Sequence, residues 1–425
     1  LEQLLNSIMG TADTMMVSNI GSAAISAVSL VDSINILVIQ AFSALAAGGA
    51  IVCSQYIGQQ NKKMANESAR QVLFIITAIS IAVSVLCLGF KKPLLRLIFG
   101  SVEADVMRAS ETYFFYTAIS FPFIAAYDSA ASIFRAQENT KGPMLISMIS
   151  NAMNIVGNAI MIWIFHMGVA GAAWATITAQ GVSGVLCLIY IIKYVPELRL
   201  KADDWRFRSE IAKKEILVGI PMGLQYSITA IGTMMVQSAL NILGSYAVAA
   251  FTAGNKIENI FTQAYVAIGT TMATYNAQNI GARKLDRVRQ GFNSAHIIGI
   301  TYAIVTGVII FFFGKYLSYL FISDNAAEVI PMVDTYVKCV AVFFIPLHFV
   351  NALRNGIQGM GYGLLPMLAG VAELAGRGIT AMIAAAHKSY FGACMASPMA
   401  WVLAGGLLIV MYFYVMKDMK RRLGL

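Results

Sequence analysis

Charged side chains are scarce in this 425-residue chain, where Asp, Glu, Lys and Arg together make up 12% of the residues. A soluble domain carries about 25% charged residues. Hydrophobic residues reach 58%, the mean hydropathy is +0.70, and only short polar loops separate the long apolar runs. These values exclude an ordinary soluble protein and indicate a chain embedded in a membrane.

Alternation of polar and apolar residues is also missing, which excludes the strands of a transmembrane barrel. Backbone N–H and C=O groups inside a bilayer must be paired within the protein, so the apolar runs are expected to be helices. We predict an all-α integral membrane protein with about twelve spans of roughly 20 residues or more. They are placed at residues 1–19, 27–57, 71–90, 112–136, 142–166, 169–194, 214–242, 247–279, 292–314, 330–358, 362–386 and 390–416.

Clusters of metal ligands or nucleophiles are absent from the sequence as well. The five cysteines lie apart within apolar runs, so they are expected to pack in the core rather than form disulfides or bind metal. The four histidines are far apart in sequence, which argues against a membrane-embedded enzyme. No basic face with a recognisable fold behind it suggests nucleic-acid binding.

Basic residues explain the net charge of +9, and they concentrate in alternate loops. The positive-inside rule therefore places both termini in the cytoplasm and makes the longest basic connection, 195–213, cytoplasmic. The chain begins at Leu1 inside an apolar segment without a basic region before it. This start indicates a truncated first helix rather than a signal peptide.

The two halves of the chain are related by an internal repeat. A shift of 223 residues aligns residues 21–58 with residues 244–281 without a gap, with identities that include Gln40 with Gln263. We predict an N-terminal six-helix lobe (1–194), a linker (195–213) and a C-terminal six-helix lobe (214–425). Because six is even, both lobes have the same orientation, as in transporters that bind substrate between two rocking halves.

Ionisable groups inside spans point to function because they are costly there. The first half carries Asp13 and Asp128, and its fifth span carries Asn151, Asn154 and Asn158 at i, i+3 and i+7, on one helix face. These amides are either hydrogen-bonding contacts between helices or part of a hydrated pocket shared with the two acids. The next span adds Thr176 and Gln180, one turn apart.

The second half has a different set of polar residues. Glu373 and Arg377 are spaced i, i+4, which favours an ion pair within one helix. His348 lies in mid-span, where a hydrogen-bonded structural role is favoured over a proton relay. Under the 223-residue shift Asp13 meets a valine, Val236, so the acid of the first half has no counterpart. Cation coupling is therefore expected in the first half.

Several motifs occur in a fixed order along nearly the whole chain. They are Thr11-Ala-Asp13-Thr, Gln55-Tyr-Ile-Gly-Gln, Arg135-Ala-Gln-Glu-Asn-Thr-Lys-Gly-Pro143, Gly168-Val-Ala-Gly-Ala-Ala-Trp-Ala-Thr176, Gly219-Ile-Pro221, Gln278-Asn-Ile-Gly-Ala282 and Gln358-Gly-Met-Gly. With these motifs in this order within a double six-helix repeat, the chain resembles bacterial or archaeal members of the multidrug and toxic compound extrusion (MATE) family. The resemblance implies a monomeric exporter of organic cations or amphipathic compounds in the inner membrane, driven by H⁺ or Na⁺ and using no other cofactor.

The resemblance also suggests site residues. Family members carry an acid on the first helix, matched here by Asp13, and often Asn-x-x-Asn-x-x-x-Asp on the fifth, where this chain has Asn158 instead of the acid. Asp128 on the fourth helix is expected to replace that missing carboxylate. The expected cation-coupling residues are Asp13, Asp128, Asn151, Asn154, Asn158, Thr176 and Gln180. The expected substrate contacts are Met9, Gln40, Gln225, Gln263, Asn351, Glu373 and Arg377.

Two other functions of membrane proteins were weighed against efflux. A flippase for lipid-linked oligosaccharides or cell-wall precursors would need several arginines to hold a pyrophosphate, and only Arg377, with Arg354 or Lys256, is available. A channel is disfavoured because the chain has a two-lobe repeat and no filter-like loop.

The proposed relocation of the carboxylate gives a direct prediction. Asp128→Asn is expected to abolish transport about as completely as Asp13→Asn, because either change removes one of two required carboxylates. Efflux of a cationic dye from vesicles measures the effect, and near-normal efflux in the Asp128→Asn variant would refute the relocation.

Overall fold

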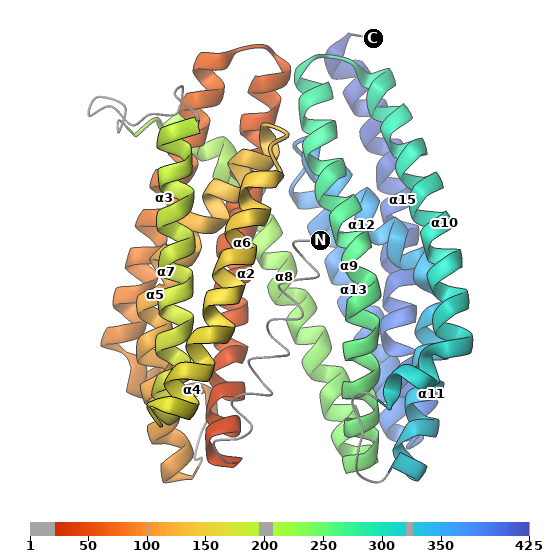
Figure 1. The fold of residues 1–425 in the computed structure, drawn as a ribbon. Coiled ribbons are helices and arrows are strands. Elements are labelled where there is room, and N and C mark those ends of the chain that lie inside the picture. Colours follow the sequence, from red (N-terminus) through yellow and green to blue (C-terminus); the bar gives the residue numbers. More distant parts are fainter. Residues whose placement is uncertain (1–21, 100–102, 195–206, 320–325, 425) are drawn as a thin grey trace. The chain divides into compact units, whose positions relative to one another are not determined.

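The computed structural model describes residues 22–99, 103–194, 207–319 and 326–424. Within these ranges the chain is helical and contains no strand, as Figure 1 shows. The helices are α2 (Ser22–Gly58), α3 (Lys62–Gly89), α4 (Lys91–Phe99), α5 (Ala104–Ala136), α6 (Lys141–Asn158), the π-helical turn η1 (Ala159–Ile164), α7 (Gly168–Tyr194), α8 (Ser209–Leu243), α9 (Ser245–Gly281), α10 (Leu285–Ser318), α11 (Ala326–Val342), α12 (Phe344–Gly359), α13 (Leu364–Ala386), α14 (Tyr390–Cys394) and α15 (Ala396–Leu423).

Length and composition identify the membrane-spanning helices. Among the described residues, eight helices are long and apolar enough to cross a bilayer, or nine if the bent pair α11 and α12 forms one span. Helices α5 and α9 contain 33 and 37 residues, which is enough to cross a bilayer about 30 Å thick at 1.5 Å per residue. They are not among these eight helices because their sequences are less apolar. The all-α membrane fold predicted from the sequence is confirmed, while the first predicted span lies outside the described residues.

The tenth predicted span, 330–358, is broken in the structure. Helix α11 ends at Val342 and α12 begins at Phe344, with a bend of 52° between them. Pro346 lacks an N–H group to donate to the carbonyl of Val342, and its ring would collide with that carbonyl in a continuous helix. The structure also adds the short helix α4, which no predicted span included.

The described chain forms two compact units. The first contains the residues up to Ile57 and Asn61–Gly223, and the second contains Gly58–Gln60 and Leu224 onward. The boundary falls inside α8, later than the linker expected at 195–213. The first turns of α8 belong to the first unit because Gly219 lets the helix approach α2, where a Cβ on Gly48 would lie 2.6 Å from the Cα of Gly219.

The first unit has its core around α5, which packs against α3 and α7, while α6 packs against α7. Phe42 of α2 and Phe121 of α5 meet edge to face, with ring centroids 6.1 Å apart. Phe114 and Phe134, also on α5, are fully buried in the same core. Asn154 and Asn158 of α6 are buried inside this unit.

The second unit is built around α9 and α12, which approach closely through glycines. A Cβ on Gly359 would lie 2.2 Å from the carbonyl oxygen of Ala273, and one on Gly269 would lie 2.6 Å from Nδ2 of Asn355. Small residues allow such backbone contacts between membrane helices. Helix α15 packs against α12 and α13, so α12 contacts both α9 and α15.

The contact between α9 and α12 gives a stability prediction. Gly359→Ala is expected to lower the thermal unfolding temperature of the purified protein by several degrees, because overpacking costs about 1–3 kcal/mol. The matched control is Gly406→Ala on α15, where a Cβ meets no atom within 4 Å. Equal unfolding temperatures for the two variants would contradict the close approach.

Candidate functional site

An amide cluster joins α6 and α7 in the first unit. Asn158 donates from Nδ2 to Oδ1 of Asn154 over 3.3 Å, and Asn154 donates from Nδ2 to Oγ1 of Thr176 over 3.3 Å. Both asparagines are buried, and Thr176 is half-buried and also donates to the carbonyl of Ala172. The structure therefore brings together three of the residues expected to couple cations.

The end of α6 is irregular beside this cluster. The helix passes at Asn158 into the π-helical turn η1. π-Helical turns often occur at functional sites. They widen the helix by one residue, so they change the direction of the side chains that follow. The turn begins directly after Asn158, the last amide of the cluster along α6.

Two further residues expected to couple cations lie on the same helices as this cluster. Asn151 lies half-buried on α6, and Gln180 lies half-buried on α7, one turn beyond Thr176. Asp128 lies half-buried on α5, the helix that packs against α7. Asp13 lies outside the described residues, as does Met9.

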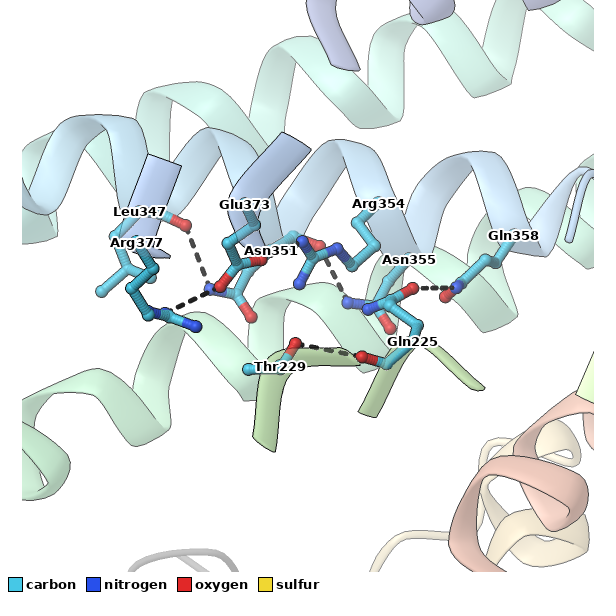
Figure 2. A network of polar contacts seen from close by, with 9 residues as sticks. All are labelled: Gln225, Thr229, Leu347, Asn351, Arg354, Asn355, Gln358, Glu373 and Arg377. Atoms are coloured by element: carbon cyan, nitrogen blue, oxygen red, sulfur yellow. Dashed lines mark hydrogen bonds and ion pairs between the residues drawn. The ribbon is translucent and has the colours of Figure 1, made fainter. Parts of the chain in front are cut away.

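A closed set of ionic contacts lies in the second unit. Arg354 of α12 donates from Nη2 to Oε2 of Glu373 over 2.6 Å, and Arg377 donates from Nη2 to Oε1 of Glu373 over 2.8 Å. The side chains of Glu373, Arg377 and Arg354 are only 4%, 8% and 12% exposed, respectively. The ion pair predicted within α13 is confirmed, and an arginine from α12 completes it (Figure 2).

These charged groups line a cavity of about 290 Å³. Its walls come from α8, α9, α11, α12, α13 and α15, all within the second unit. The lining residues are Thr233, Val236, Phe251, Asn255, Glu258, Thr262, Val266, Tyr336, Leu347, Val350, Asn351, Arg354, Glu373, Arg377, Ser397 and Trp401. Three of the expected substrate contacts, Asn351, Glu373 and Arg377, are among them.

A second carboxylate faces the same cavity. Glu258 of α9 is buried and accepts a hydrogen bond from the hydroxyl of Tyr336 on α11. It also interacts electrostatically with Arg377. Glu258 was not among the site residues expected from the sequence, although an acid inside a span is a signal for a functional residue. Its partner Tyr336 lies 78 residues away in sequence, so no spacing rule indicates the contact.

Amide side chains continue the polar network away from the cavity. Gln358 of α12 donates from Nε2 to Oε1 of Gln225 on α8 over 3.0 Å, and both are buried. Thr229 donates to the carbonyl of Gln225, and Asn355 donates to the carbonyl of Asn351 (Figure 2). Gln225 is therefore a structural partner of α12 rather than part of the cavity wall.

The remaining expected substrate contacts lie elsewhere. Gln40 is half-buried on α2 in the first unit, and Gln263 is half-buried on α9 without lining the cavity. Lys256, considered as an additional cation for a pyrophosphate, is exposed on α9 and does not line the cavity either. The cavity therefore has two arginines and no lysine among its lining residues.

Two histidines that are distant in sequence meet in the second unit. Nδ1 of His296 on α10 lies 3.2 Å from Nε2 of His348 on α12, and His348 is fully buried. Gly299 makes room for this pair, because a Cβ there would lie 2.0 Å from the ring of His348. The contact agrees with a hydrogen-bonded His348. Among the described residues, no three or more His, Cys, Asp or Glu side chains lie close enough together to hold a metal ion.

Comparison with known proteins places both halves of the chain in one family. The MatE family model matches residues 1–160 and 221–382, and the two stretches begin 220 residues apart, close to the shift of 223 that relates the halves. The probable multidrug resistance protein YpnP of Bacillus subtilis is 29% identical over 359 residues, which cover 84% of this chain and 79% of YpnP. The probable multidrug resistance protein NorM of Thermotoga maritima is 27% identical over 382 residues, which cover 86% of this chain and 79% of NorM.

Solved structures agree on the fold. An outward-facing multidrug resistance MATE family transporter of the MOP superfamily matches with a TM-score of 0.92 and 19% identity, covering 98% of this chain and 93% of that one. The family model covers well over half of the sequence, in both of its halves. The chain therefore belongs to the MatE family of membrane transporters, the family that its motifs resemble.

Proposed function

We propose that this protein is a secondary active multidrug exporter of the inner membrane. It exchanges organic cations or amphipathic compounds for H⁺ or Na⁺ by alternating access. The observation that carries the proposal is that both halves of the chain match the transporter family. The relatives named multidrug resistance proteins support the same substrate class. In this proposal the chain acts as a monomer, catalyses no chemical reaction and has both termini in the cytoplasm.

The cation would be bound in the first unit. Asp13 and Asp128 supply the carboxylates, and the amide cluster of Asn154, Asn158 and Thr176 supplies neutral polar groups on α6 and α7. Oxygen ligands of this kind suit Na⁺, and a carboxylate inside a membrane takes up H⁺ readily because its charge is costly there. The residues therefore support either ion.

Coupling follows if the ion binds more tightly in one arrangement of the two units than in the other. An uncompensated carboxylate destabilises an arrangement that shields it from water. Uptake of H⁺ or Na⁺ removes that penalty and shifts the population toward the shielded arrangement. Substrate that binds better to the opposite arrangement is then exchanged for the ion.

The proposal is tested with proteoliposomes that contain the purified chain and a fluorescent organic cation. An imposed gradient of pH or of sodium is expected to drive dye movement, and the effective gradient identifies the coupling ion. Asp13→Asn is expected to reduce the gradient-driven rate at least tenfold, because the variant cannot exchange its charge.

Asp105→Asn is the matched control, since Asp105 is exposed at the start of α5. This variant is expected to transport at the rate of the unaltered protein. Dye movement that is independent of both gradients, or an Asp13→Asn variant that remains fully coupled, would overturn the proposal.

A further inference from the structure

Arg377, which lines the cavity of the second unit, carries one unused hydrogen-bond donor. Nη1 of Arg377 is buried and has no hydrogen-bond partner, whereas Nη2 of the same guanidinium donates to Glu373. Among the lining residues, Arg377 is the one with a buried side-chain nitrogen or oxygen left without a partner in the described chain. Figure 2 shows the second terminal nitrogen pointing away from Glu373. A buried donor of this kind is costly unless a ligand or water meets it.

The carboxylates in the cavity are already engaged. Glu373 accepts from two guanidinium groups, and Glu258 accepts from Tyr336 and interacts with the charge of Arg377. An incoming cation would compete with these arginines for the same carboxylates. An incoming oxyanion would instead meet the free donor of Arg377, since guanidinium groups pair well with carboxylates and phosphates.

The size and walls of the cavity indicate more than a water site. Its volume of about 290 Å³ is several times the ~30 Å³ that a water molecule occupies in the liquid. Phe251 and Trp401 provide aromatic surface, and Val236 and Leu347 provide aliphatic surface. Ligand pockets typically combine such apolar walls with a few fixed polar groups.

We propose that this cavity binds an oxyanion, a carboxylate or phosphate, carried by an amphipathic transported compound, and that the free N–H groups of Arg377 hold it. The inference rests on the proposed transport function and names a substrate class for it. The apolar part of the compound lies against Phe251 and Trp401. The transporter accordingly accepts anionic or zwitterionic compounds in addition to cations.

The test uses a dansyl amino acid, which has an aromatic body and a free carboxylate, and its methyl ester, which lacks the charge. Fluorescence titration of the purified full chain in detergent is expected to give binding at least tenfold tighter for the acid. Arg377→Gln is expected to weaken binding of the acid at least tenfold and leave the ester unchanged. Arg287→Gln, at an exposed arginine of α10, is the matched control and is expected to leave both unchanged.

A second variant tests the proposal even if the Arg377→Gln protein does not fold. Glu258→Gln removes a negative charge beside the proposed oxyanion, so it is expected to strengthen binding of the acid several-fold. A gain in affinity cannot come from an unfolded protein. Equal affinities for acid and ester, or weaker binding of the acid to Glu258→Gln, would overturn the inference.

Further measurements distinguish a lipid headgroup from a transported compound as the source of the oxyanion. They also distinguish failure of this inference from failure of the proposed function. Displacement of the probe by dioctanoyl phosphatidic acid at lower concentration than by free acid would assign the cavity to a lipid headgroup and overturn the assignment to a transported compound. Dye efflux is measured after the same purified protein has been reconstituted into proteoliposomes. Efflux that persists without selectivity for the acid refutes this inference alone, whereas loss of efflux refutes the proposed function.

Discussion

The absence of water inside a bilayer is the constraint on which this structure depends. Each backbone polar group must be paired within the protein, so the chain is helical throughout its described ranges. The same constraint applies to side chains. Glu373 is held between two arginines, Tyr336 donates to Glu258, and Asn154 is bonded on both sides. Nη1 of Arg377 is left without a hydrogen-bond partner, and burial of such a donor costs free energy. We therefore interpret it as a ligand contact rather than as a stabilising group.

The two units meet this constraint with different chemistry. The first uses neutral amides and a hydroxyl on α6 and α7. The second uses charged pairs, with two arginines and two glutamates lining one cavity. An internal repeat therefore preserved the helical scaffold while the polar residues diverged. In the proposed function, the coupling ion binds in one half and part of the substrate binds in the other.

Much of the fold could be predicted from the sequence because long apolar runs and a six-helix repeat are local or periodic signals. Contacts within one helix were predictable too, and the i, i+4 spacing identified the pair of Glu373 and Arg377. Contacts between helices were not. Arg354 reaches Glu373 from another helix, and His296 meets His348 across 52 residues. These contacts depend on which helix faces pack together, and no spacing in the sequence encodes that. The bend at Phe343 was not predicted because the spans were placed by hydropathy, which does not indicate where a proline such as Pro346 bends a helix.

Helix α8 is shared by the two units, with its first turns in one and the rest in the other. Pro221 lies just before the boundary and has no N–H to donate to the carbonyl of Leu217, so the backbone there is easier to bend than elsewhere in the helix. A reorientation of one unit would bend or twist this shared helix. Because Thr233 and Val236 lie further along α8 and line the charged cavity, such a deformation would move part of its wall. Substrate recognition and the reorientation of the units would then be linked through α8.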